Sequence, residues 1–105
     1  MWTVEYLPAA AEERAALPAE MRARLFRMVE AIESTGLLRL PRGWAKPLGG
    51  KLWELRVTGK DGIARAIYVT ASGQRLVIVR IYVKKTQKTP RHELELAHQR
   101  AKEIE

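Results

Sequence analysis

Three strand-like runs follow one another between residues 52 and 84, and they constrain the fold more than any other feature of the sequence. The runs are 52–57, 63–70 and 74–84, and the last is the richest in β-branched residues. Only short turns separate them: the first contains Asp61-Gly62, a pair typical of hairpins, and the second contains Ser72-Gly73. Because the links are short, we expect an antiparallel three-stranded meander.

Helical patterns lie on both sides of this meander. Residues 2–6 alternate as a short strand, residues 9–16 form an Ala- and Glu-rich helix, and a longer helix begins at Pro18 and ends near Thr35-Gly36. The apolar residues of this longer helix recur at helical spacing: Met21, Leu25, Met28, Val29 and Ile32. Thr89-Pro90 is interpreted as an N-cap followed by a first-position proline. The helix after it has an apolar stripe, Leu94, Ala97, Ala101 and Ile104.

The predicted element order is β-α-α-β-β-β-α, in a single domain over residues 1–105. This length suits one domain, and a composition of 47% hydrophobic and 30% charged residues is that of a globular protein. We expect an α+β, two-layer fold whose helices pack on one face of a small, mostly antiparallel sheet. Residues 37–51 are expected to form a loop. Gly49-Gly50-Lys51 lacks the first Gly and the Ser/Thr of a phosphate-binding loop, so we interpret it as a turn.

Positive charge is concentrated in the middle of the chain. The net charge is +7, and residues 34–92 contain 13 of the 19 Lys and Arg but only two acidic residues, Glu54 and Asp61. A charge excess confined to one segment favours a surface that binds a polyanion. The alternative is a solvated basic face without a nucleic-acid partner.

The sequence predicts a cytoplasmic protein without metal, cofactor or membrane contact. It contains no cysteine, which excludes disulfides and thiolate metal sites and fits a reducing compartment. The first ten residues do not resemble a signal peptide, and the apolar stretch near residues 76–83 is too short to span a bilayer. His92 and His98, six residues apart, make a poor metal site.

Alternation along the strands predicts one cationic sheet face. In the last run we place Val77, Val79, Ile81 and Val83 on one face. Leu76 and Ile78 share the other face with the polar residues. The polar surface then carries Arg56, Arg65, Arg80, Tyr82 and Lys84, with Lys85 and Lys88 just beyond. Arginine suits bidentate contacts with phosphate, and tyrosine can stack on a base. The alternative is an ordinary wet sheet face on which Glu54 pairs with a neighbouring Arg.

Three segments resemble the RelE/HigB superfamily of toxins from type II toxin–antitoxin pairs, and in particular its phage-derived HigB-like branch. They are residues 48–56 (Leu-Gly-Gly-Lys-Leu-Trp-Glu-Leu-Arg), 61–68 (Asp-Gly-Ile-Ala-Arg-Ala-Ile-Tyr) and 83–90 (Val-Lys-Lys-Thr-Gln-Lys-Thr-Pro). The resemblance covers essentially the whole chain and implies a RelE-like fold. It also implies a ribosome-dependent, metal-independent mRNA endoribonuclease that is held inactive by a helix-turn-helix antitoxin, with a heterotetramer among the expected assemblies.

The resemblance assigns roles by position. In such chemistry the ribose 2′-OH attacks the adjacent phosphate, and the protein supplies a base, an acid and cations. Arg56 and Arg65 would clamp the scissile phosphate, and Lys84 or Lys85 would stabilise charge or transfer a proton. Two tyrosines and several nearby cations complete the expected RNA-binding set: Tyr68, Tyr82, Lys46, Lys51, Arg80 and Lys88.

The identity of the proton-transfer group stays open. Many relatives carry a His or Tyr near the C-terminal end, whereas the strands of this chain contain no His. His92, at the start of the last helix, is the candidate because the positive helix end favours a neutral base; an exposed surface His is the alternative. Two other functions therefore stay open: a non-catalytic nucleic-acid or ribosome-binding module, and a phage-derived interaction protein with an acidic partner.

Overall fold

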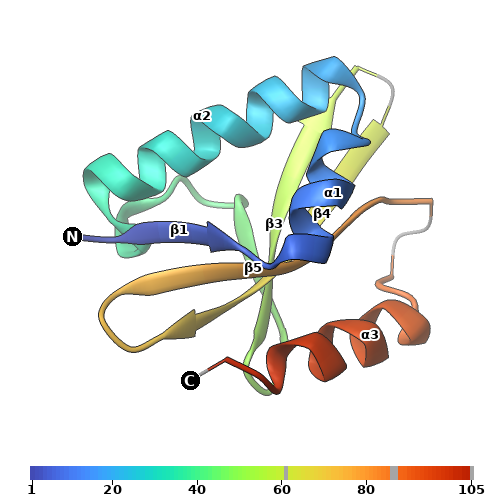
Figure 1. The fold of residues 1–105 in the computed structure, drawn as a ribbon. Helices are drawn as coiled ribbons and strands as arrows, with labels where there is room; N and C mark the ends of the chain where they lie inside the picture. Colours follow the sequence, from blue (N-terminus) through green and yellow to red (C-terminus); the bar gives the residue numbers. More distant parts are fainter. Residues whose placement is uncertain (61, 86–87, 105) are drawn as a thin grey trace.

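The computed structural model describes residues 1–60, 62–85 and 88–104. The described chain forms, in order, β1 (Thr3–Tyr6), α1 (Pro8–Ala15), α2 (Ala19–Thr35), β2 (Ala45–Gly49), β3 (Leu52–Gly59), β4 (Gly62–Ala71), β5 (Arg75–Val83) and α3 (Arg91–Ala101), with a short 3-10 helix at Leu37–Arg39 (Figure 1). The sheet order is β1-β5-β4-β3-β2; β1 runs parallel to β5 and the other neighbours are antiparallel. The α+β class and the meander of β3, β4 and β5 are confirmed.

The edge strand β2 lies in a segment that we predicted to be a loop. Its sequence, Ala-Lys-Pro-Leu-Gly, contains two residues that strands disfavour, so propensity argued against it. Ala45 pairs with Leu55 and Lys46 with Glu54, and the register shifts between Pro47 and Gly49. Proline is tolerated because β2 is an edge strand with a partner on one side only. The element order is therefore β-α-α-β-β-β-β-α.

Helices cover both faces of the sheet, and the expectation of a single covered face was wrong. On the α1/α2 face, buried residues of α2 such as Leu25 and Ile32 pack against β3, β4 and β5. On the opposite face, called the α3 face below, Ala97 of α3 packs against Ile67 and Val69 of β4. Figure 1 shows the sheet between α2 and α3. The physical reason is that six consecutive residues of β4 are buried, so both of its sides need apolar cover.

A β-bulge changes the face that the second half of β5 occupies. The register pairs Tyr68 with Ile78 but Ile67 with Arg80, so Val79 is an extra residue. The prediction of strict alternation was wrong here, because an extra residue reverses the phase of the strand. The β5 residues in the α1/α2 core are Leu76, Ile78 and Ile81, and those in the α3 core are Val77 and Val79. Arg80, Tyr82 and Lys84 still share a face, but it is the α3 face.

Two predicted features lie partly outside the described residues. They involve Asp61 of the expected Asp-Gly turn and Thr86 and Gln87 of the 83–90 segment. The pairing of Gly59 with Gly62 still confirms a tight β3–β4 hairpin. In the described part of the chain, none of the helices has the length and apolar character needed to cross a membrane.

Candidate functional site

Four basic side chains from four neighbouring strands meet on the α3 face. They are Lys46 of β2, Arg56 of β3, Arg65 of β4 and Lys84, directly after β5, and we call them the cationic row. Arg56 lies directly opposite Arg65 in the β3–β4 register. The backbone N–H of Lys84 donates to the carbonyl of Ile63, 2.7 Å away, which keeps Lys84 on the sheet next to β4. The sheet therefore assembles the row from residues up to 38 positions apart, Lys46 to Lys84.

The electrostatics of Lys84 show that these cations act on one another. Desolvation lowers the pKa of the Lys84 ammonium, the charges of Arg65, Arg56 and Lys46 lower it further, and the charge of Glu54 raises it. Like charges on directly opposed strand residues destabilise a sheet. An anion bound across the row would relieve this repulsion and would raise the pKa of Lys84 again.

Arg65 lies beneath the surface of the row, and Glu54 and Thr89 are among its partners. It is only 3% exposed, and its Nε lies 3.5 Å from Oε2 of Glu54, which is 1% exposed. The Nη1 of Arg65 donates to Oγ1 of Thr89 at 2.6 Å, and the Thr89 hydroxyl donates to Oε1 of Glu54 at 3.2 Å. A buried charge needs such partners. The pairing of Glu54 with a neighbouring Arg, which belonged to the alternative interpretation of this face, is present.

The ring of Tyr82 borders this buried group. Tyr82 lies directly opposite Arg65, and among the described residues its buried hydroxyl has no hydrogen bond of ordinary geometry. Burial raises the pKa of the Tyr82 phenol, although the nearby Arg65 and Thr89 lower it in part. The phenol is therefore neutral at physiological pH. Its ring packs against the core of the α3 face, with the Arg80 guanidinium carbon 5.7 Å from the ring centroid.

Thr89 does not cap α3, and that prediction was wrong. Pro90 is the N-cap residue, with an extended backbone (φ −60°, ψ 146°), and its carbonyl accepts from the N–H groups of Glu93 and Leu94. The Thr89 hydroxyl points instead to Arg65 and Glu54. The Thr-Pro pair in the sequence does not distinguish these two uses of the hydroxyl.

Arg80 lies on the α3 face but is engaged by carboxylates of two helices. It donates to Glu93 of α3 through Nε (2.6 Å) and Nη2 (3.0 Å), and its Nη1 donates to Glu13 of α1. Glu13 also accepts from Arg100 (2.9 Å) and from the N–H of Ile81 (3.0 Å). This network fastens α1 and α3 to β5. The guanidinium of Arg80 is hydrogen-bonded to these carboxylates, so its placement does not support the predicted contact between Arg80 and RNA.

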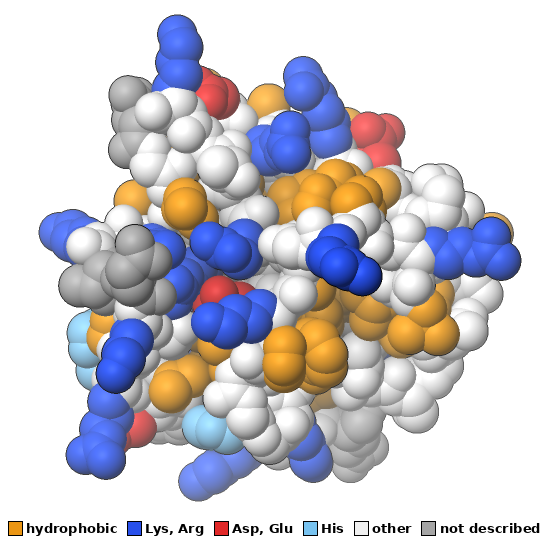
Figure 2. All heavy atoms as spheres, turned by 180° about the vertical axis from the view of Figure 1, so that it is seen from behind, with side chains coloured by type: hydrophobic (Ala, Val, Ile, Leu, Met, Phe, Trp, Pro, Cys, Tyr) orange, Lys and Arg blue, Asp and Glu red, His pale blue; other side chains and the backbone are white. Residues whose placement is uncertain are grey.

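The remaining predicted cations are on the surface. Lys51, Lys85 and Lys88 are exposed, as is Lys46 of the row. Figure 2 shows a face on which Lys and Arg side chains far outnumber those of Asp and Glu. His92, in the first turn of α3, has a 77% exposed side chain whose Nε2 lies 3.5 Å from Oε2 of Glu93, the setting of a surface histidine. Within residues 1–60, 62–85 and 88–104, no group of three His, Asp or Glu forms a metal-binding cluster.

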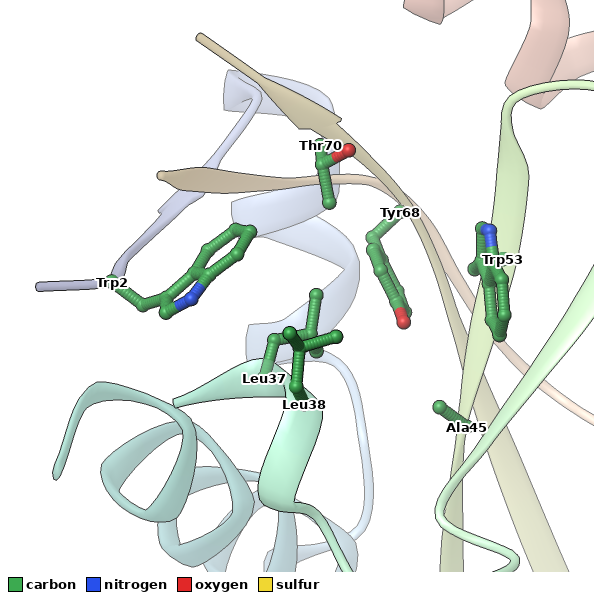
Figure 3. Close-up of a pocket in the computed structure, with 7 residues that line it drawn as sticks. All are labelled: Trp2, Leu37, Leu38, Ala45, Trp53, Tyr68 and Thr70. Carbon is green, nitrogen blue, oxygen red and sulfur yellow. The ribbon is translucent and has the colours of Figure 1, made fainter. Parts of the chain in front are cut away.

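Tyr68 lies on the other face of the sheet, away from the cationic row. It is 2% exposed, and burial raises the pKa of its phenol to about 12. It lines an apolar pocket of about 330 Å³ whose other lining residues are Trp2, Leu37, Leu38, Ala45, Trp53 and Thr70 (Figure 3). No lining residue is charged, so this hollow is separate from the cationic site, and the position of Tyr68 does not suit the predicted stacking on RNA.

Comparisons with known proteins agree on the fold. A chain of the YoeB–YefM complex from Staphylococcus aureus superposes with a TM-score of 0.58 at 14% identity, covering 81% of this chain and 99% of that one. The isolated Escherichia coli RelE toxin gives 0.57 at 15% identity, covering 94% and 98%. A chain of the intact Escherichia coli RelBE toxin–antitoxin complex gives 0.53 at 15% identity, covering 82% and 100%. No curated protein matches the sequence.

The family assignment comes from the sequence itself. A family model described as "Phage derived protein Gp49-like (DUF891)" matches residues 12–102, which include the cationic row and all of α3. The expected phage-derived, RelE-like character is thus confirmed at the level of family and fold. The chain belongs to the phage-derived Gp49-like family and has a RelE-like α+β fold.

Proposed function

We propose that this protein is the toxin of a toxin–antitoxin pair and cleaves mRNA on the ribosome, in the cytoplasm. The observation that carries the proposal is the cationic row, in which two arginines face each other and an adjacent lysine has a lowered pKa. Such an arrangement costs stability unless an anion binds there. Membership of the Gp49-like family and the likeness of the fold to RelE and YoeB support the choice of RNA as that anion.

The proposed reaction is an internal transfer at one phosphodiester. The ribose 2′-oxygen releases its proton to solvent water and attacks the adjacent phosphorus. The bond to the 5′-oxygen breaks, and that oxygen takes a proton from Lys84, which regains one from solvent afterwards. The products are a 2′,3′-cyclic phosphate and a 5′-hydroxyl. Arg56 and Lys84 are half-buried at the surface of the row and would contact the phosphate oxygens, where negative charge builds up. Arg65 lies too deep for direct contact in this conformation and adds positive potential from below.

Lys84 suits proton transfer better than Lys85 or His92 does. A lysine whose pKa is lowered by desolvation and by neighbouring cations gives up its proton more readily than an ordinary lysine. Lys84 also belongs to the row, whereas Lys85 is exposed and the His92 side chain is 77% exposed. We therefore place Lys84 at the leaving 5′-oxygen as the proton donor.

A helix-turn-helix antitoxin with an acidic segment is the proposed protein partner. Two of the similar structures are toxin–antitoxin complexes. Glu54 is buried, so the basic middle of the chain exposes little negative charge to such a segment. Charge attraction predicts that association slows markedly as the salt concentration rises.

A non-catalytic RNA- or ribosome-binding module is the second candidate. The observation that favours it is the exposed position of His92, which leaves the row without a histidine partner among the described residues. The mechanism above requires Lys84 to act in place of that histidine.

Growth of cells after induction of the gene tests the proposal. We expect the wild-type protein to arrest growth and Lys84→Ala to abolish the arrest while the protein stays folded. Lys102→Ala is the matched control because Lys102 is exposed beyond α3, and it should arrest growth like the wild type. Arrest that persists in Lys84→Ala contradicts the site. No arrest by folded, ribosome-binding wild-type protein favours the non-catalytic module.

A further inference from the structure

Thr89 uses one hydroxyl group for two hydrogen bonds inside the protein. Its Oγ1 accepts from Nη1 of Arg65 at 2.6 Å and donates to Oε1 of Glu54 at 3.2 Å. The Arg65–Glu54 pair is nearly inaccessible to water, with side chains 4% and 1% exposed, and its direct contact, Nε to Oε2, is long at 3.5 Å. The Thr89 hydroxyl therefore bridges the Arg65 guanidinium and the Glu54 carboxylate, whose direct contact is too long for a good hydrogen bond.

We propose that Thr89 is a positioning residue, which fixes the Arg65 guanidinium beneath the cationic row and couples that position to helix α3. The functional part of this inference rests on the proposed function, because it concerns the same site. The structural part, the dependence of the Arg65 position on the Thr89 hydroxyl, stands by itself.

The position of Thr89 explains how the coupling works. Thr89 comes two residues before α3, and α3 is fastened to β5 four residues later, where Glu93 accepts two hydrogen bonds from Arg80. The backbone at Thr89 is therefore fixed by the packing of α3, and its hydroxyl transmits that position to Arg65. Since Arg65 faces Arg56 across the strands, a rotation of its guanidinium changes the field along the row.

The chemistry predicts which substitutions preserve the role. A hydroxyl is an acceptor and a donor at once, so serine can replace threonine. Valine has the shape of threonine but neither capability, so Thr89→Val removes one partner of the buried Arg65 and one partner of the buried Glu54. A hydrogen bond to a charged group contributes about 1.5–3 kcal/mol, which corresponds to a tenfold or larger change in an equilibrium.

The first part of the test uses the free protein and needs no RNA. NMR of the Arg65 Nε–Hε group, labelled with ¹⁵N, reports how rigidly the guanidinium is held through its exchange with water. We expect at least tenfold faster exchange in Thr89→Val and exchange within about threefold of wild type in Thr89→Ser. Unchanged exchange in Thr89→Val overturns the proposal. If Thr89→Val does not fold, Thr89→Ala is measured against Thr89→Ser in the same way.

The second part measures cleavage of ribosome-bound mRNA by the same variants. We expect kcat to fall about tenfold in Thr89→Val with little change in KM, because the hydroxyl does not contact RNA, and we expect Thr89→Ser to restore kcat. An equal loss in Thr89→Val and Thr89→Ser contradicts a positioning role. If the wild-type protein cleaves nothing while the exchange rates behave as expected, the proposed function fails and the coupling of Thr89 to Arg65 stands.

Discussion

Arg56 on β3 lies directly opposite Arg65 on β4, so two guanidinium groups share one cross-strand position in the middle of the sheet. Among the described residues, only the deeper one has a carboxylate paired with it, the buried Glu54. Cross-strand pairs of like charge oppose folding, and the hydrophobic core on the other side of β3 and β4 has to compensate for this pair. We interpret the pair as a binding feature retained at the expense of stability.

Replacing the more accessible arginine should therefore stabilise the protein. We expect Arg56→Thr to raise the free energy of unfolding by about 0.5 kcal/mol and the melting temperature by about 3 °C, while RNA binding weakens. Thermal unfolding followed by circular dichroism measures the first effect. Arg39→Thr, at an exposed arginine of the 3-10 helix, is the control and should change neither quantity. A lower melting temperature for Arg56→Thr would show that the arginine pair is not strained.

Loss of the Glu54 charge should have the opposite effect. Glu54→Gln leaves the buried Arg65 without its carboxylate, and removing one partner of a buried ion pair costs about 3 kcal/mol. Denaturant unfolding measures this loss. Glu5→Gln is the matched control: its pair with Arg75 is also 3.5 Å long but 45% and 35% exposed, so the loss should stay below about 1 kcal/mol. Similar losses in the two variants would be inconsistent with a charge-dependent role for Glu54.

Lys84 should titrate below the ordinary lysine value of 10.5, because desolvation and three nearby cations disfavour its charged form. In the pH interval between its folded pKa and 10.5, the unfolded chain holds a proton that the folded chain has lost. The contribution of Lys84 to the free energy of unfolding therefore rises with pH through that interval. NMR titration of the Lys84 ammonium measures the pKa, and Arg56→Ala should raise it. A short RNA analogue bound to the row should raise it too; no change on RNA binding argues against phosphate contact at Lys84.

Glu13 predicts how the protein responds to acid. Burial raises the pKa of its carboxyl, but hydrogen bonds from Arg100, the Ile81 N–H and Arg80 outweigh this and hold it below 4.5. Its stabilising contribution is thus complete above 4.5 and is lost as the pH falls through the lower, folded value. Melting temperatures of wild type and Glu13→Gln should differ at neutral pH and converge under acid. A difference that stays constant with pH would rule out an ionic contribution from Glu13.

Much of the fold could be predicted because it depends on local patterns. The helical spacing of Met21, Leu25, Met28 and Ile32 located α2, and all four are buried. The short turns and β-branched runs located β3, β4 and β5. Strand β2 could not be predicted, because its pairing with β3 overrides a sequence that contains Pro and Gly. The bulge at Val79 leaves no trace in composition, yet one extra residue reverses the faces of half a strand.

The candidate site was predictable where it depends on strand alternation and unpredictable where it depends on distant partners. Alternation placed Arg56, Arg65 and Lys84 together on one face. Arg80 donates to Glu13, 67 residues away in the sequence, and Arg65 donates to Thr89, 24 residues away. Contacts of this kind are set by the docking of α1 and α3, which no local pattern of the sequence encodes.

Primer extension on a reporter mRNA tests the central claim most directly, in a cell-free translation system with wild-type protein, Lys84→Ala and the control Lys102→Ala. We expect wild type and Lys102→Ala to produce discrete cuts only while the message is being translated. The cuts should be unchanged when EDTA is added to preformed ribosome complexes, and they should be absent with Lys84→Ala. Equal cutting by Lys84→Ala, or no cutting by folded wild-type protein that binds ribosomes, would contradict an RNA-cleaving site on the cationic row.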